Sequence, residues 1–340
     1  MKLIRAGNSP LLEPASRQWE SRAVFNPAVF KWQGKIHLLY RAQGEDEVSR
    51  LGMVRMRTPT EVEERKAEPV FSPDPDSEYE SLGVEDPRVT QIGEEYFMTY
   101  VAASKYPPLL RKPPHPREED WRVRVSLAKT NDFISWSRYG VIISHIDSKD
   151  AALFPEKIDD SFCLLHRVIP HIRIAISNEG GRRYKERGPV FGPREGMWDG
   201  ERVGVGSPPL KCPFGWILFY HGVDEKKVYR LGIALLDMED PSLVIARTMD
   251  PVLEPEEAWE KAGRVNNVVF TCGAIEDGGK YWVYYGGADT VIGVATISKD
   301  EVCAWAKEEL AKSKYHEFDQ IGRITSEETE ERRKRGSSAR

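Results

Sequence analysis

The sequence predicts an all-β protein: a five-bladed β-propeller with a C-terminal helical tail. Two observations favour this fold. A strand, a tight turn and a second strand recur five times, at a spacing of about 50 to 70 residues that is typical of propeller blades. These five units occupy nearly all of the 340-residue chain between about residues 20 and 300. We therefore expect one propeller domain over residues 1–298 and a helix with a charged tail over residues 299–340.

The five copies share an apolar first strand, a polar turn and a second strand rich in aromatic residues. Their first strands begin at Asn26, Glu85, Leu153, Ser207 and Thr271. A single unit cannot bury both faces of its sheet, so the units must pack round a common axis. Aromatic residues at alternate positions suit such half-buried strands.

Composition narrows the class of protein. The net charge of −5 mixes both signs along the chain, which gives no reason to expect binding to nucleic acid or to an anionic membrane. The N-terminus lacks a signal-peptide core, and no apolar run approaches the roughly 20 residues of a membrane span, so we expect a cytoplasmic protein. The cysteines lack CxxC spacing, which favours reduced thiols over a metal site or disulfides. They are Cys163, Cys212, Cys272 and Cys303.

Two segments stand outside the repeat. Residues 105–121 are rich in proline and basic residues, and we expect a long insertion in the second blade that either shapes a binding site or is a surface excursion. Asp300 to Lys314 has the pattern of an amphipathic helix, with Val302, Trp305 and Leu310 near one face. The charged run Glu327 to Arg335 is either a solvated end or a contact in a homo-oligomer.

Polar residues recur at equivalent positions of the repeat. Asn26 and Asp86 each precede a first-strand proline, and Arg41 ends a second strand. Because the inner strands of all blades face the central channel, such residues converge although they are far apart in sequence. Charges that end apolar strands must meet a ligand or one another, so the alternatives are a site and salt bridges between blades. The converging set is Asn26, Arg41, Asp86, Arg167, Lys211, His221 and Asp289.

The ratio of acidic to basic residues in this set indicates which type of reaction the site catalyses. A glycosidase that uses water needs two carboxyl groups, but the converging positions offer one outstanding carboxylate, Asp86. Facing it are Lys149, Arg167 and Lys211, with His221 nearby. Such a cationic cluster suits an anionic nucleophile held by charge-assisted hydrogen bonds. Inorganic phosphate would replace the catalytic water, so the sequence predicts phosphorolysis.

Several runs resemble the mannoside phosphorylases of glycoside hydrolase family 130, in order from about residue 20 to residue 298. They are Gly83–Val89, Lys149–Lys157, Leu164–Arg167, Trp198–Gly200, Gly206–Lys211, Tyr220–Val223, Tyr229–Gly232, Leu236–Pro241 and Tyr284–Asp289. The resemblance implies a five-bladed propeller and an inverting cleavage of β-mannosides by phosphate, which gives α-mannose 1-phosphate. It implies an oligosaccharide and inorganic phosphate as partners, and no metal or organic cofactor.

The resemblance also implies roles for single residues. Asp86 matches the catalytic acid, which is thought to protonate the glycosidic oxygen through a hydroxyl of the mannose. The positions that match phosphate ligands or plausible phosphate contacts are Lys149, Arg167, Lys211 and His221. The predicted substrate contacts are Asn26, Arg41, Asp150, Asp199 and Asp289. Asp150 stands where some relatives have Asn, and an acid there opposes phosphate unless Lys149 or Arg167 pairs with it.

Other readings stay open at this point. Asp86 before Pro87 is also a common turn pattern. The indole of Trp198 either stacks on a sugar ring or fills the core, and Gly286-Gly287 either admits a ligand or forms a bulge. The alternative functions are a β-mannosidase in which Glu156 or another acid serves as base, and a sugar-binding propeller without catalysis. The linkage, β-1,4 or β-1,2, and the acceptor sugar are not fixed by the sequence.

Overall fold

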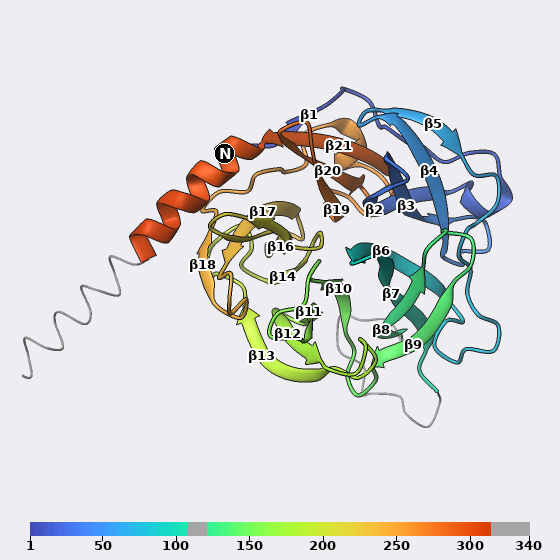
Figure 1. Ribbon diagram of the computed structural model, residues 1–340. Helices are drawn as coiled ribbons and strands as arrows, with labels where there is room; N and C mark the ends of the chain where they lie inside the picture. Colours follow the sequence, from blue (N-terminus) through green and yellow to red (C-terminus); the bar gives the residue numbers. More distant parts are fainter. Residues whose placement is uncertain (108–120, 314–340) are drawn as a thin grey trace, which may run out of the picture.

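The computed structural model describes residues 1–107 and 121–313, and it confirms the five-bladed propeller. Figure 1 shows five sheets arranged in a ring, with the inner strands β2, β6, β10, β14 and β19 nearest the centre. Neighbouring strands within each sheet pair antiparallel. In blades 1 to 4 the innermost strand thus comes first along the chain, as the repeat predicts.

The strands follow one another outward in each of the first three blades. Blade 1 holds β2 (Ala23–Trp32), β3 (Lys35–Gln43), β4 (Arg50–Thr58) and β5 (Glu61–Arg65). Blade 2 holds β6 (Gly83–Ile92), β7 (Glu95–Lys105), β8 (Trp121–Thr130) and β9 (Ser137–Ile143). Blade 3 holds β10 (Lys149–Leu153), β11 (Phe162–Val168), β12 (His171–Ser177) and β13 (Lys185–Phe191). Lys105 pairs with Trp121, so the predicted insertion joins two strands of blade 2, although residues 108–120 lie outside the described residues.

Blades 4 and 5 depart from this plan. Blade 4 holds β14 (Arg202–Val205), β15 (Leu210–Cys212), β16 (Gly215–Val223), β17 (Tyr229–Leu236) and β18 (Val244–Arg247), and both β14 and β15 pair with β16. Blade 5 holds β19 (Val269–Asp277), β20 (Lys280–Gly287) and β21 (Val291–Ser298), with β1 (Ile4–Arg5) from the N-terminus as its outer strand. The pairing of β1 with β21 closes the ring. Short helices occur at η1 (Gln18–Glu20) and α1 (Ala258–Lys261).

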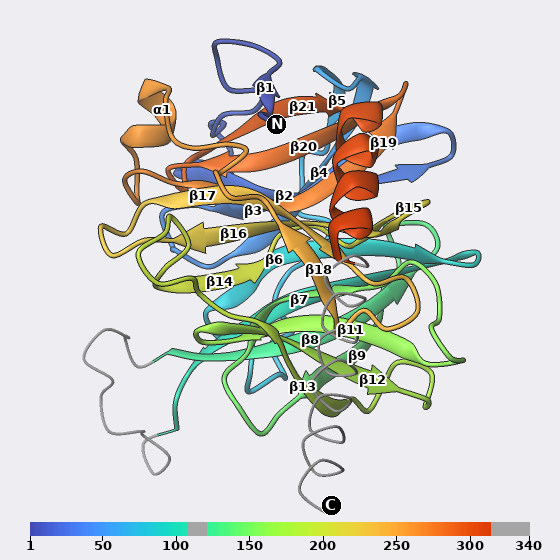
Figure 2. The same cartoon turned by 90° about the vertical axis from the view of Figure 1, so that its left-hand side faces the viewer.

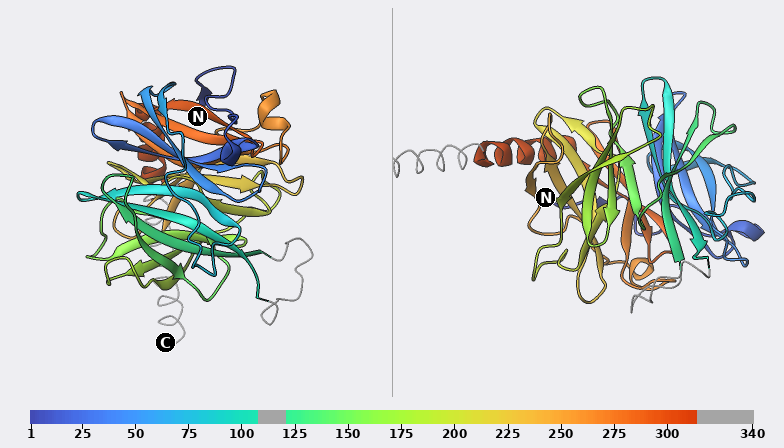
Figure 3. Two further views of the ribbon diagram at one scale, coloured as in Figure 1. Left: turned by 90° about the vertical axis from the view of Figure 1, so that its right-hand side faces the viewer. Right: turned by 90° about the horizontal axis from the view of Figure 1, so that it is seen from below.

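Apolar faces pack between adjacent blades. The cluster between blades 4 and 5 includes Phe219, Leu231 and Tyr285, all fully buried. Residues 299–313 are helical, and Val302 and Ala306 are buried in the same cluster. The predicted amphipathic helix is therefore confirmed over its described part. Figure 2 shows it against the outer side of the blades, and in Figure 3 it projects beyond their rim. No helix among the described residues is long and apolar enough to cross a membrane.

A backbone irregularity in the inner strands positions the polar residues of the channel. Asn26, Asp86 and Asp150 have φ angles of 49°, 49° and 51°, and the strand register shifts at each of them. Asn and Asp are the side chains that best tolerate this left-handed conformation. Such bulges re-aim side chains and are common beside active sites. The conformation explains the residue types, and the bulge brings the three side chains to equivalent places round the channel.

Candidate active site

Asp86 lies where blades 1 and 2 meet, and blade 1 fixes its carboxylate. Asn26 Nδ2 donates a 2.9 Å hydrogen bond to Asp86 Oδ1, and Arg41 Nη1 lies 3.3 Å from the same oxygen. Asn26 and Asp86 are buried. The structure therefore brings together three residues that the sequence predicted to converge.

Arg41 is itself held by a set of residues to which the sequence assigned no role. Its Nη2 donates to Glu85 Oε1 at 2.6 Å, and its Nε donates to Ser49 Oγ at 3.0 Å. The guanidinium also lies 4.6 Å from the centre of the Phe25 ring. Burial raises the pKa of Glu85, while the charge of Arg41 opposes that shift. Arg41 is thus fixed in one position beside Asp86.

Asp289 lies in the turn between β20 and β21 of blade 5 and faces the same group of charges. Burial raises the pKa of Asp289 to about 6, with the charge of Arg41 lowering it and that of Asp86 raising it. Gly286 leaves room for Asn26, because a Cβ there would lie 2.5 Å from Asn26 Oδ1. That glycine accommodates a protein side chain. The pairing register of β20 does not shift at Gly286 or Gly287, so the predicted alternative of a bulge is wrong.

Asp150 forms the centre of a second cluster, between blades 3 and 4. Its carboxylate is fully buried, with Arg167 Nη1 3.0 Å and His221 Nε2 3.5 Å from Oδ2. Arg88 Nη2 lies 3.6 Å from Oδ1. Burial opposes ionisation, but the positive charges of Arg167 and Arg88 hold the pKa of Asp150 well below its usual value. Asp150 is therefore an anion within a basic cluster.

Arg88 connects the two clusters, and no role was predicted for it from the sequence. Its Nη1 donates to the backbone oxygen of Asp86 at 3.0 Å, and its Nε donates to the oxygen of Gly206 at 2.7 Å. The guanidinium group of Arg88 therefore contacts both the backbone of Asp86 and the carboxylate of Asp150. A charged side chain in a strand that the repeat places inside the propeller was the available signal.

His221 is buried and electrically neutral. Burial lowers the pKa of His221 well below its usual value, and Asp150 opposes the shift. Arg167 Nη1 lies 3.4 Å from His221 Nε2, and the ring packs on Phe270 with centroids 4.4 Å apart. A Cβ at Gly204 would lie 2.4 Å from this ring. Glycine is therefore required for β14 to lie this close to His221.

Arg202, at the start of β14, is a basic residue that sequence reasoning missed. Its Nη2 donates to the hydroxyl of Tyr229, and its charge contributes to the lowered pKa of His221. Three buried nitrogens of the basic residues have no hydrogen-bond partner among the described residues, namely Arg167 Nε, Arg202 Nε and His221 Nδ1. Unpaired buried polar atoms are costly, and two of the three belong to residues that contact Asp150, so the cluster offers a place for an anion.

Lys211 and Glu156 are not part of this site. Lys211 pairs with Trp216 at the beginning of β16, whereas His221 lies five residues further along the same strand, a separation of roughly 17 Å. Lys211 forms an exposed ion pair with Glu156. The predicted convergence of Lys211 with the other site residues is therefore wrong, because β15 carries it to the other end of the blade. Glu156, the suggested base of a hydrolase, is equally remote.

Asp199 is near the site but is not available to a ligand. Its carboxylate is fully buried, and it accepts hydrogen bonds from Arg194 Nε at 3.0 and 3.1 Å and from the Tyr220 hydroxyl at 2.9 Å. Its role is to hold the turn before β14 against β16. The structure therefore places Asp199 among protein partners and not with the other predicted substrate contacts.

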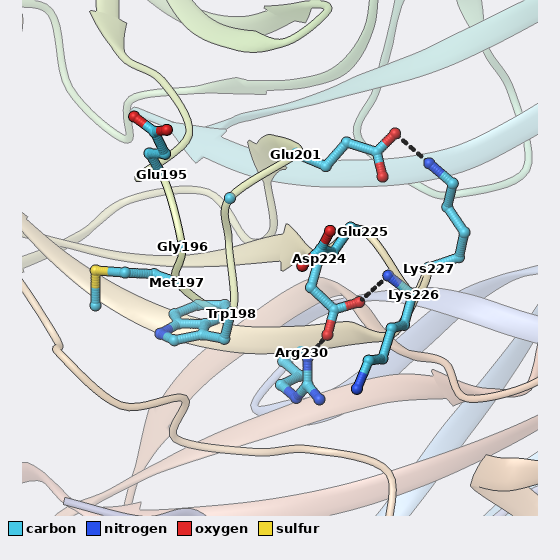
Figure 4. Close-up of a pocket in the computed structure, with 11 residues that line it drawn as sticks. Glu195, Gly196, Met197, Trp198, Glu201, Asp224, Glu225, Lys226, Lys227 and Arg230 are labelled. Carbon is cyan, nitrogen blue, oxygen red and sulfur yellow. Dashed lines mark hydrogen bonds and ion pairs between the residues drawn. The ribbon is translucent and has the colours of Figure 1, made fainter.

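The neighbouring Trp198 lines a pocket of about 860 Å³. Figure 4 shows the pocket between the segments 195–201 and 224–230. These segments flank the start of β14 and the end of β16, the end of blade 4 that carries Arg202. Trp198 stacks on Tyr220, with centroids 5.5 Å apart, and its indole nitrogen donates to the oxygen of Met249. It therefore serves the packing of blade 4 and also contributes to the surface of the pocket.

Fold and site together define a class of protein: a five-bladed propeller whose channel holds a fixed aspartate beside a buried basic cluster. Comparison with known proteins identifies the family. The sequence matches the glycoside hydrolase family 130 model, described as beta-1,4-mannooligosaccharide phosphorylase, over residues 5–308. The chain belongs to this family.

Three relatives show how close the similarity is. A 1,2-beta-oligomannan phosphorylase of Thermoanaerobacter sp. is 40% identical over 310 residues, which are 89% of this chain and 99% of the relative. A beta-1,2-mannobiose phosphorylase of the same organism is 39% identical, covering 88% of this chain and 99% of the relative. Among solved structures, a beta-1,2-mannobiose phosphorylase from Listeria innocua in complex with beta-1,2-mannobiose has a TM-score of 0.79 at 27% identity, covering 90% of this chain and 99% of that one.

The described residues contain no group of three or more His, Cys, Asp or Glu side chains arranged to hold a metal ion. The charged groups of the site are instead one acid cluster round Asp86 and one basic cluster round Asp150. Phosphate is the co-substrate of the phosphorylases in this family, and the basic cluster provides donors of the kind that bind it.

Proposed function

We propose that this chain is an inverting β-mannoside phosphorylase that converts a β-mannoside and inorganic phosphate into α-mannose 1-phosphate and a shortened sugar. One observation carries the proposal. A single fixed aspartate, Asp86, lies beside a buried basic cluster in which three nitrogens have no hydrogen-bond partner among the described residues. That arrangement suits an acid on one side of the reacting bond and an anionic nucleophile on the other.

The residues of the site have three roles: binding of the mannose unit, proton transfer and binding of phosphate. Asn26, Arg41 and Asp289 hold the mannose unit, and Asp86 supplies the proton that the leaving glycosidic oxygen takes up. Lys149, at the start of β10 and paired with Arg167, joins the basic cluster. The phosphate ligands are Lys149, Arg167, Arg202 and His221. A phosphate oxygen forms the new bond to the anomeric carbon as the glycosidic bond breaks, and attack from the opposite face gives the α-anomer.

For the linkage, we propose β-1,2. The two relatives that are 40% and 39% identical to this chain are both named as phosphorylases of β-1,2-linked mannosides. A beta-1,4-mannooligosaccharide phosphorylase of Ruminococcus albus is 28% identical over 65% of the chain. The higher identity and the longer coverage both favour the β-1,2 linkage.

The experiment is to incubate purified protein with β-1,2-mannobiose or β-1,4-mannobiose, with and without phosphate. We expect α-mannose 1-phosphate to form only with phosphate, and faster from the β-1,2 disaccharide. Release of free mannose at equal rates in both conditions would contradict the proposal and identify a hydrolase. That outcome has a precedent, since the description of one solved relative states that the family contains glycoside hydrolases that target β-1,2 mannosidic linkages.

A further inference from the structure

The carboxylate of Asp150 is an unusual neighbour for a bound anion. It lies in the basic cluster proposed to bind phosphate, and it is fully buried. Both of its oxygens lack a hydrogen bond within the described part of the chain. The contact of 3.0 Å with Arg167 Nη1 is an ion pair by distance but not a hydrogen bond by geometry. Charge balance alone does not explain an acid whose lone pairs stay unpaired in a buried site.

The donors round Asp150 place an anion beside it. If Arg167 Nη1 donates to His221 Nε2, as their 3.4 Å separation allows, the proton of the neutral ring is on Nδ1. That N–H then joins Arg167 Nε and Arg202 Nε as a buried donor without a protein partner among the described residues. Arg167 and His221 both contact Asp150 Oδ2. Because Arg167 Nη1 lies 3.0 Å from that oxygen, an oxyanion bound by Arg167 Nε lies close to the carboxylate.

Whether an oxyanion binds favourably beside Asp150 depends on whether the anion carries a proton. Phosphate keeps at least one hydroxyl group at neutral pH, and this hydroxyl can donate a charge-assisted hydrogen bond to a carboxylate. Sulfate has the same shape but carries no proton. It would present an oxygen lone pair to Asp150 Oδ1 or Oδ2, with like charges in contact and no hydrogen bond.

We propose that Asp150 selects the oxyanion, accepting a hydrogen bond from a protonated oxygen of phosphate and excluding sulfate. The inference rests on the proposed function, because it assigns a role within the same phosphate site. It extends that function by making Asp150 the residue that distinguishes protonated from fully ionised tetrahedral anions. A site that pairs with a ligand hydroxyl strongly rejects the analogue that lacks it.

The first test uses the unchanged protein. Phosphorolysis of β-1,2-mannobiose is measured at limiting phosphate with increasing sulfate, and separately with arsenate in place of phosphate. We expect arsenate, which is protonated like phosphate, to support cleavage. We expect the inhibition constant of sulfate to exceed the KM for phosphate by on the order of 100-fold or more. A sulfate inhibition constant close to the KM for phosphate would overturn the inference.

The second test uses Asp150→Asn, which keeps the size of the side chain and offers sulfate a donor. We expect the ratio of the sulfate inhibition constant to the KM for phosphate to fall by on the order of 100-fold. The matched control is Lys211→Ala, which removes a positive charge at the other end of the blade and should leave the ratio unchanged. If Asp150→Asn shifts both constants together, Asp150 only balances charge and the inference is wrong.

Failure of the proposed function can be told apart from failure of this inference. If no β-mannoside is cleaved with phosphate, calorimetric titration of the unchanged protein with phosphate and with sulfate still tests the anion site. Binding of phosphate without binding of sulfate would support the role of Asp150, and equal binding of the two would refute it. If Asp150→Asn does not fold, the measurements on the unchanged protein decide.

Discussion

The two halves of the site are built in opposite ways. In the acid half, round Asp86, the protein itself supplies nearly all the partners: Asn26, Arg41, Ser49 and Glu85 form one connected network. One atom is an exception within the described chain, Asn26 Oδ1, which is buried without a partner. In the basic half, round Asp150, three donor nitrogens and both carboxylate oxygens lack hydrogen bonds among the described residues.

This difference shows which half is complete before a ligand binds. The connected network holds the acid in a fixed orientation, which is the preorganisation that catalysis needs. Each unpaired buried group in the basic half costs about 1–3 kcal/mol, and a bound oxyanion would remove much of that cost. We infer that the acid half determines the rate of the chemical step and that the basic half determines affinity for phosphate.

Asp86→Asn should have the largest effect, because the residue carries the proton of the reaction. We expect kcat to fall by about 100-fold to 10,000-fold. The affinity for the mannoside should change little, since the amide oxygen of the introduced asparagine can still accept a hydrogen bond from Arg41. Initial rates and calorimetric titration with β-1,2-mannobiose measure the two quantities. A variant that keeps normal turnover would show that Asp86 only forms the turn before Pro87.

Arg167→Ala should act on phosphate and on stability. Loss of one charge-assisted hydrogen bond, worth about 1.5–3 kcal/mol, raises the KM for phosphate by about 10-fold to 100-fold. The KM for the mannoside should stay nearly constant. The variant also leaves Asp150 as a buried charge with less compensation, which typically lowers the free energy of unfolding by about 3–5 kcal/mol.

The double variant Arg167→Ala with Asp150→Asn is the matched control for that stability effect. Removal of the uncompensated carboxylate should restore part of the lost free energy of unfolding, as measured by chemical denaturation, although the KM for phosphate stays high. If the double variant is as unstable as Arg167→Ala alone, the loss comes from packing and the ion pair contributes little.

The same contrast explains what could be predicted from the sequence. The repeat predicted the number of blades, and the residues before the first-strand prolines predicted Asn26 and Asp86, because a local pattern fixes the bulge where they lie. Arg167 and His221 followed from the ends of the second strands. These positions depend on the strand register alone, and the register shift of the inner strand recurs in blades 1, 2 and 3.

The inner strand of blade 4 departs from this register, and the predicted position of Lys211 is wrong. The sequence aligns Pro208-Pro209 with the prolines of the other blades and so places Lys211 in the channel. In the structure the inner strand divides into β14 and β15, and the residue near the site is Arg202 of β14. The better guide would have been pairing with the second strand, since Gly204 opposite His221 corresponds to Phe25 opposite Arg41.

Asp289 offers a pH-dependent test of the acid half. Its raised pKa of about 6 means that the carboxylate forms only above that pH, so kcat/KM for the mannoside should rise as pH increases through about 6. Stability has the opposite sign: the folded-state pKa exceeds the usual 3.8, so the free energy of unfolding falls as pH rises between these values. In Asp289→Asn, both kcat/KM for the mannoside and the free energy of unfolding should depend less on pH in these ranges. An unchanged acidic limb in the rate profile of the variant would assign that limb to another group.

Lys211→Ala should have the smallest effect, and for that reason it tests the placement of the whole basic half. Lys211 and Glu156 form an exposed ion pair, with about half of each side chain accessible, and pairs of this kind contribute about 0–1 kcal/mol. We expect the KM for phosphate to change by less than about twofold and thermal stability to change little. Arg202→Ala, which removes a cation at the site end of the same blade, should raise the KM for phosphate by about 10-fold or more. A large effect of Lys211→Ala together with a small effect of Arg202→Ala would reverse our assignment of the two ends of blade 4.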